Sequence, residues 1–95
     1  LLLAGNCITE KGIKHLVKCK FTKLNCLGLF SNKISDLGLK YLSQTPSIFS
    51  FLEMLIIGNN KLTDDGLANF ESNTFKMLKV LDLSGISYSL LGLQS

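Results

Sequence analysis

His15 and three cysteines are the side chains of this sequence best suited to nucleophilic or metal chemistry. The cysteines are Cys7, Cys19 and Cys26, an odd number separated by eleven and six residues. This spacing forms neither the CxxC pair of a zinc knuckle nor a closed disulfide framework, and it favours reduced thiols. A zinc site needs four suitably spaced ligands, and a Cys/His dyad needs both side chains within hydrogen-bond reach. We therefore expect no metal site and no dyad.

Carboxylate and phosphate chemistry are also poorly supported by this sequence. Asp64 and Asp65 are adjacent, but they lie where we expect a helix to begin, and acids there complement the helix dipole. The glycines lack the GxxxxGK and GxGxxG contexts of phosphate-binding loops. All ten basic residues are lysines, which argues against arginine-based phosphoryl transfer and bidentate base recognition. We expect no enzyme, no cofactor, no small-molecule substrate and no nucleic-acid partner.

The strands and helices that we expect to carry these residues belong to an internal sequence repeat. Four segments align without gaps: LLLAGNCITEKGIKHL from Leu1, LGLFSNKISDLGLKYL from Leu27, LIIGNNKLTDDGLANF from Leu55 and LDLSGISYSLLGLQS from Leu81. Apolar residues occupy the first and third positions of every copy, as expected for a strand with one face in the core. The strand and strand-approach residues predicted to face the core are Leu1, Leu3, Leu24, Leu27, Leu29, Leu52, Leu55, Ile57, Leu78, Leu81 and Leu83.

Polar and small residues recur at fixed positions behind each strand. The sixth position holds Asn6, Asn32 or Asn60, whose amides can satisfy backbone groups of a neighbouring coil. In the fourth copy Ile86 takes this place, so the asparagine ladder should fail there. A hydroxyl follows at each expected helix N-cap, and three residues later comes a glycine where close packing would exclude a side chain. The hydroxyls are Thr9, Ser35, Thr63 and Ser89, and the glycines are Gly12, Gly38, Gly66 and Gly92.

The segments from Leu24 to Leu42 and from Leu52 to Phe70 match the pattern LxxLxLxxNxIxxxGxxxL. With these copies, essentially the whole chain resembles a leucine-rich repeat protein of the ribonuclease-inhibitor-like class. It is similar to ribonuclease inhibitor and to the arrays of NOD-like receptors and of the Ran GTPase-activating protein. The resemblance implies an α/β fold, a right-handed solenoid with a parallel sheet on its concave face and helices on its convex face. It also implies a surface for protein–protein interaction.

The repeat predicts a single leucine-rich-repeat domain, 1–95. Its units are 1–23, 24–51, 52–77 and 78–95. Stacked units share one core, so both ends of an array need polar capping segments. Leu1 begins within a strand and Ser95 falls in the fourth expected helix, so we expect a fragment of a longer array whose ends meet neighbouring repeats or self-associate. No apolar run approaches the roughly 20 residues of a membrane span, and we expect a cytoplasmic protein without a membrane partner.

Alternate strand positions point away from the core and make the expected concave face unusually apolar. A protein partner on this face is our first hypothesis, because apolar anchors supply much of the energy of protein interfaces. Lysines just beyond the strands are second-choice contacts. The candidate contacts are Cys26, Phe30, Met54, Ile56, Val80 and Asp82 on the face, with Lys33 and Lys61 on its rim.

Other interpretations stay open. The apolar face can be covered by another segment of a longer protein, or it can be a tolerated surface. The array can act as a structural or autoinhibitory sensor segment of a multidomain regulator, as the resemblance to NOD-like receptors implies. A GTPase-activating protein similar to that for Ran is a third interpretation, which no residue supports specifically. We expect a solvated surface at the basic stripe of Lys11, Lys14, Lys18, Lys20 and Lys23.

Overall fold

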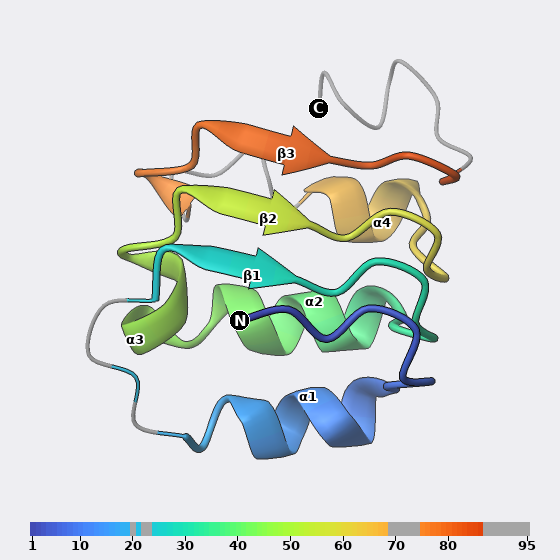
Figure 1. The fold of residues 1–95 in the computed structure, drawn as a ribbon, viewed down its shortest axis with the longest axis horizontal. Coiled ribbons are helices and arrows are strands. Elements are labelled where there is room, and N and C mark those ends of the chain that lie inside the picture. The colour runs from blue at the N-terminus through green and yellow to red at the C-terminus, as the bar shows by residue number, and fades with distance from the viewer. Residues whose placement is uncertain (20, 22–23, 69–74, 87–95) are drawn as a thin grey trace.

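The computed structural model describes residues 1–19, 21, 24–68 and 75–86, and in them strands alternate with helices (Figure 1). The elements are α1 (Glu10–Leu16), β1 (Cys26–Gly28), α2 (Asp36–Ser43), α3 (Pro46–Phe49), β2 (Met54–Ile56), α4 (Asp64–Leu67) and β3 (Val80–Asp82). None of the helices in the described residues is long and apolar enough to cross a membrane. The predicted positions outside the described residues are Lys20, Lys23, Phe70, Ser89 and Gly92.

The three strands form one parallel sheet in the order β1-β2-β3. Leu27 pairs with Leu55, and Leu55 pairs with Leu81, so equivalent repeat positions lie side by side. Residues 1–5 run along the outer edge of β1 and are joined to it and to its loop by backbone hydrogen bonds of 2.7 to 3.0 Å. Figure 1 shows the helices of the described residues on one side of this sheet, and none of these helices covers its other side.

The core lies between the sheet and the helices, and the predicted apolar columns fill it. Its fully buried members include Leu27, Leu29, Leu52, Leu55 and Ile57 of the strand segments and Ile13, Leu39 and Leu42 of the helices. Leu24, Leu78, Leu3, Leu81 and Leu83 are partly buried against this cluster. Leu1 is 44% exposed, so the prediction that it faces the core was wrong. In the described part of the chain, a neighbouring strand lies on only one side of Leu1.

The asparagine column is confirmed as a link between neighbouring units. Asn32 is 8% exposed, and its Oδ1 accepts the backbone N–H groups of Asn6 at 2.9 Å and Ile8 at 3.0 Å. Its Nδ2 donates to carbonyl oxygens of both units. Asn60 makes equivalent bonds between the second and third units. Ile86, at this position in the fourth copy, is buried instead.

One backbone position after each strand has a left-handed conformation. The fifth residue of each copy has φ of 72° at Gly5, 57° at Ser31, 51° at Asn59 and 76° at Gly85. Glycine adopts this conformation freely, whereas other residues pay roughly 1 kcal/mol for it. The Asn59 Nδ2 donates to the Ser31 Oγ at 3.0 Å, which links two successive turns. These turns lead the chain from the sheet towards the helix layer.

The hydrogen bonds at the helix N-termini differ from those predicted. Thr9, Ser35 and Thr63 do precede α1, α2 and α4, but none of their side chains makes the predicted capping bond. The Thr63 hydroxyl instead donates to Asp36 of the preceding unit. The other carboxylate oxygen of Asp36 accepts the Thr63 N–H at 2.8 Å. A contact between units has therefore replaced the expected cap within one unit.

Close packing at the glycine column is confirmed, and at Gly66 it is a contact between units, because a Cβ there would overlap the Asp36 carboxylate of the preceding unit. At Gly38 and Gly12 the closest atom belongs to the same unit. A Cβ would lie 2.8 Å from the Ile34 Cγ2 at Gly38 and 2.7 Å from the Ile8 Cγ2 at Gly12. Helix α3 was not predicted, and it occurs between Leu27 and Leu55, where the starts of successive copies are 28 residues apart instead of 26.

Candidate functional site

The side of the sheet that points away from the helices, which we call the open face, carries three rows of side chains. The strand register sets the first two rows, and backbone hydrogen bonds beyond the strands set the third. The rows are Cys26, Met54 and Val80; Leu2, Gly28, Ile56 and Asp82; and Ala4, Phe30, Gly58 and Ser84. The six contacts that the sequence placed on this face therefore lie together.

The open face exposes large apolar side chains. Phe30 is 37% exposed and Val80 is 46% exposed, while Met54 and Ile56 are partly exposed. Leu2 is 74% exposed and was not among the predicted contacts, although its position in the first copy matches that of Ile56 in the third. The position of Leu2 in the repeat was therefore enough to predict it as a contact residue.

Glycines shape the surface between these side chains. A Cβ on Gly28 would lie 2.7 Å from the Cδ2 of Leu2, so the Leu2 side chain covers the space that Gly28 leaves. A Cβ on Gly58 would overlap the carbonyl oxygen of Ser84, so the backbones approach closely there. The third row consequently has no side chain between Phe30 and Ser84.

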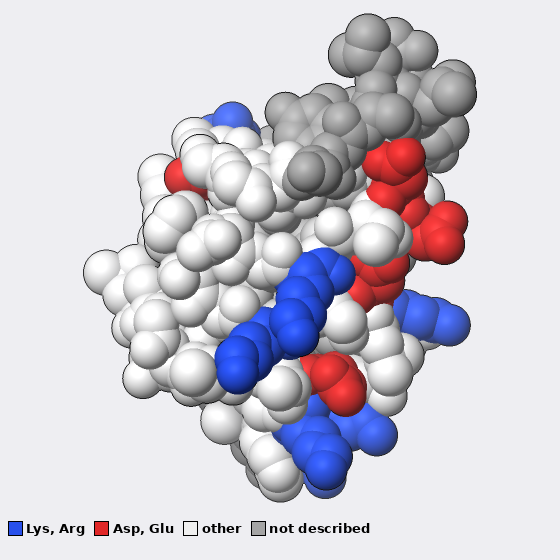
Figure 2. All heavy atoms as spheres, turned by 90° about the vertical axis from the view of Figure 1, so that its right-hand side faces the viewer, with Lys and Arg blue, Asp and Glu red and all other residues white. Residues whose placement is uncertain are grey.

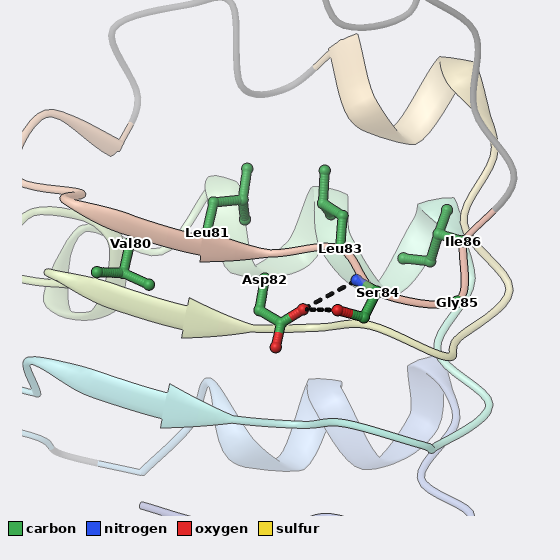
Figure 3. Close-up of a pocket in the computed structure, with 7 residues that line it drawn as sticks. All are labelled: Val80, Leu81, Asp82, Leu83, Ser84, Gly85 and Ile86. Atoms are coloured by element: carbon green, nitrogen blue, oxygen red, sulfur yellow. Dashed lines mark hydrogen bonds between the residues drawn. The ribbon is translucent and has the colours of Figure 1, made fainter.

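Asp82 is the one charged residue in the three rows. Figure 3 shows Asp82 and Val80 on one side of β3 and Leu81 and Leu83 on the other. The Asp82 Oδ1 accepts the Ser84 hydroxyl at 2.6 Å and the Ser84 backbone N–H at 2.9 Å. These hydrogen bonds, the hydroxyl first, lower the pKa of Asp82 below its ordinary value of 3.8, because they stabilise the ionised carboxylate. Asp82 thus presents a fixed negative charge within an apolar surface.

An ion pair borders the open face where the strands begin. Lys79 Nζ lies 2.9 Å from Glu53 Oε1, so these two charges offset each other. A shallow hollow of about 290 Å³ lies beside them. Its lining residues are Asn25, Cys26, Glu53, Met54, Lys79 and Val80. The Cys26 thiol, which is free, therefore belongs to the rim of this hollow.

Lys33 and Lys61 follow the left-handed turns at the opposite ends of the strands. Their backbone N–H groups donate to carbonyl oxygens of the preceding units, each at 2.8 Å, and both residues are exposed. Figure 2 looks onto this end and shows lysine and acidic groups gathered over it, beside a broad uncharged area. The lysines therefore belong to a charged rim, distinct from the three apolar rows.

The residues considered for catalysis are spread over the molecule. His15 lies in α1 and Cys26 lies on the open face, so the core separates them. Asp64 and Asp65 occupy the first turn of α4. Within residues 1–19, 21, 24–68 and 75–86, no three His, Cys, Asp or Glu side chains form a group that could hold a metal ion.

Comparison with known proteins gives one match to a protein family. A family model described as "Leucine Rich repeat" matches residues 22–43, which include β1, its turn and α2. No curated protein matches the chain. The match does not confirm the ribonuclease-inhibitor-like class. Repeats of this family are typically non-catalytic modules of protein interaction. The match supports a leucine-rich repeat protein, and the parallel sheet with its helices fits the α/β fold of that family.

Proposed function

We propose that this chain is part of a right-handed solenoid of the ribonuclease-inhibitor-like class, and that it binds a protein partner through the open face. In such a solenoid the open face is the concave face. The repeat spacing and the parallel register of equivalent positions support this architecture.

The apolar exposure of the open face is the observation that carries the proposal. Leu2, Phe30 and Val80 are exposed in adjoining rows, on strands whose opposite faces pack into the core. Contiguous apolar surface on a soluble protein is typical of an interaction site. Because the sheet holds these side chains in register, a partner would lose little free energy in ordering them.

Phe30 is expected to be the main anchor. It is an exposed aromatic side chain in the third row, where the neighbouring Gly58 has no side chain to cover it. Met54, Ile56 and Val80 would complete the apolar contact, since residues around an anchor exclude water from it. Lys33 and Lys61 would contribute as rim charges, which affect association rates more than affinity.

A comparison of two serine substitutions and a matched control tests this proposal. Phe30→Ser and Val80→Ser remove exposed apolar groups from the open face, whereas Leu37→Ser removes an equally exposed one, at 45%, from α2. Circular dichroism and thermal unfolding would establish that each variant keeps its fold. Proteins bound by the wild-type chain would then be quantified for each variant.

We expect bound proteins to be retained by Leu37→Ser and lost from both open-face variants. Loss of one hot-spot side chain costs about 2 kcal/mol or more in interfaces, which is at least about 30-fold in affinity. Unchanged binding by folded Phe30→Ser and Val80→Ser would reject the open face as the binding site.

A further inference from the structure

We propose that the open face is built for a partner segment that combines apolar side chains with one lysine or arginine, which sits against Asp82. This inference rests on the proposed function, because it assigns the chemistry of the partner that the same face would take. It adds the requirement that the partner carries a positive charge as well as apolar side chains.

The position of Asp82 makes it part of the apolar surface. It shares a row with Leu2 and Ile56, and the strand register sets it directly beside Ile56. Val80, two residues earlier on the same side of β3, is exposed (Figure 3). A partner that covers Ile56 and Val80 must therefore also cover the Asp82 carboxylate.

The Asp82 carboxylate is held in place but is not neutralised. Both of its hydrogen bonds reach Oδ1, and both come from the uncharged Ser84. Across the described ranges, no hydrogen bond to Oδ2 and no cation paired with Asp82 occurs, and the nearby Lys79 is paired with Glu53. Ser84 thus orients one oxygen and leaves the negative charge for a ligand.

Covering an unpaired carboxylate with apolar groups is strongly unfavourable, so a partner needs a cation at this point. A lysine or arginine can donate a charge-assisted hydrogen bond to Oδ2. A second copy of this chain is a poorer occupant, because the three rows of its own open face contain no lysine. The charge complementarity therefore selects a basic, apolar segment of another protein.

A displayed library of random short peptides is a suitable probe for this chemistry. The library would be selected against the wild-type chain, and the peptides kept for analysis are those that lose binding to Phe30→Ser. We expect these peptides to be enriched in aliphatic or aromatic residues together with one lysine or arginine. Enrichment in acidic residues would overturn the inference.

Affinity measurements on the selected peptides complete the test. Replacing the enriched lysine by glutamine should weaken binding to the wild-type chain about tenfold, the effect of one charge-assisted hydrogen bond. The same replacement should change binding to Asp82→Asn by less than about twofold, because the charge it pairs with is gone. Asp65→Asn is the matched control, since it removes an exposed acid from α4, and it should retain the full tenfold effect.

The remaining outcomes separate this inference from the proposed function. Peptides that depend on Phe30 but bind Asp82→Asn as tightly as wild type would overturn the cation requirement and leave the open face as a binding site. A library that yields no Phe30-dependent peptide would overturn both. Sedimentation that shows a dimer of the wild-type chain, dissociated by Phe30→Ser, would identify a second copy as the occupant and overturn the inference.

Discussion

Asn32 and Asn6 occupy the same position of successive repeats, yet their surroundings differ. Asn32 is buried, and its Oδ1 accepts two backbone N–H groups from the first unit. Asn6 is exposed, and its Nδ2 donates to the carbonyl oxygens of Leu3 and Ala4 at 2.9 and 3.2 Å, both within its own unit. Each copy therefore forms its own turn, while a neighbouring unit decides whether that turn is buried.

The same contrast holds along the strands. Leu55 of β2 is fully buried between two paired strands, whereas Leu1 at the first position of its copy is 44% exposed. In repeat proteins, stability comes from each unit and from its interfaces with adjacent units. Positions between two paired units are therefore more deeply buried than the same positions in the first unit, so equivalent substitutions should have unequal effects.

The largest expected effect is on core packing. Leu55→Ala should lower the free energy of unfolding by about 3 kcal/mol, because it removes a fully buried side chain and leaves a cavity. Leu1→Ala should lower it by less than about 1 kcal/mol, since less apolar surface is lost there. Urea unfolding monitored by circular dichroism measures both. Equal effects would show that the first unit is as well packed as the third.

The asparagine ladder should give the next largest difference. Asn32→Ala leaves the backbone N–H groups of Asn6 and Ile8 without their acceptor, and we expect a loss of about 2 kcal/mol. Asn6→Ala removes exposed bonds within one unit and should cost less than about 1 kcal/mol. The same urea titrations apply. A similar cost for both variants would contradict a role for Asn32 between units.

A pair of glycine substitutions sharpens the comparison on the open face itself. Gly58→Ala should destabilise the chain by about 1 to 3 kcal/mol, because the new Cβ would meet the backbone carbonyl of Ser84. Gly28→Ala should change stability by less than about 0.5 kcal/mol, because its close neighbour is the end of the exposed Leu2 side chain, which can rotate away. Thermal unfolding would compare the stability of the two variants. An equal loss of stability in Gly28→Ala would mean that the Leu2 side chain cannot rotate away.

The smallest effect concerns the pH dependence of Asp82. Its pKa is lowered in the folded chain, so its hydrogen bonds to Ser84 stabilise the fold above its ordinary pKa of 3.8, and this contribution is lost as the pH falls through the folded pKa. Ser84→Ala removes the hydroxyl donor and keeps the backbone donor, so the pKa of Asp82 should rise towards 3.8. NMR titration of the Asp82 carboxyl carbon would measure this, and an unchanged pKa would exclude the hydroxyl as its cause.

Much of the fold could be predicted because each copy repeats the same local requirements. Alternation placed Leu27, Leu29, Leu55 and Ile57 in the core, and the asparagine column indicated a bond that Asn32 makes between units. These features depend on residue type and on the presence of an adjacent repeat unit. They do not depend on which side chains that adjacent unit carries.

The errors arise where a specific neighbour matters. The exposure of Leu1 depends on what packs beside its strand, and the Thr63 hydroxyl is taken by Asp36 of the preceding unit. On the open face, alternation predicted which residues point outward. It could not predict that Lys79 pairs with Glu53, because partners from different units depend on the register between those units. Nor could it predict that Asp82 accepts hydrogen bonds from Ser84, because alternation gives the direction of a side chain and not its hydrogen bonds.

Chemical-shift mapping by NMR tests the central claim most directly. The chain would be titrated with a peptide selected for Phe30-dependent binding, and backbone and methyl shifts would be followed at every assigned position. We predict that the shifts concentrate on Leu2, Phe30, Ile56, Val80 and Asp82. Shifts confined to the outer faces of α1 and α2, with the open face unchanged, would contradict the claim that this face binds a protein.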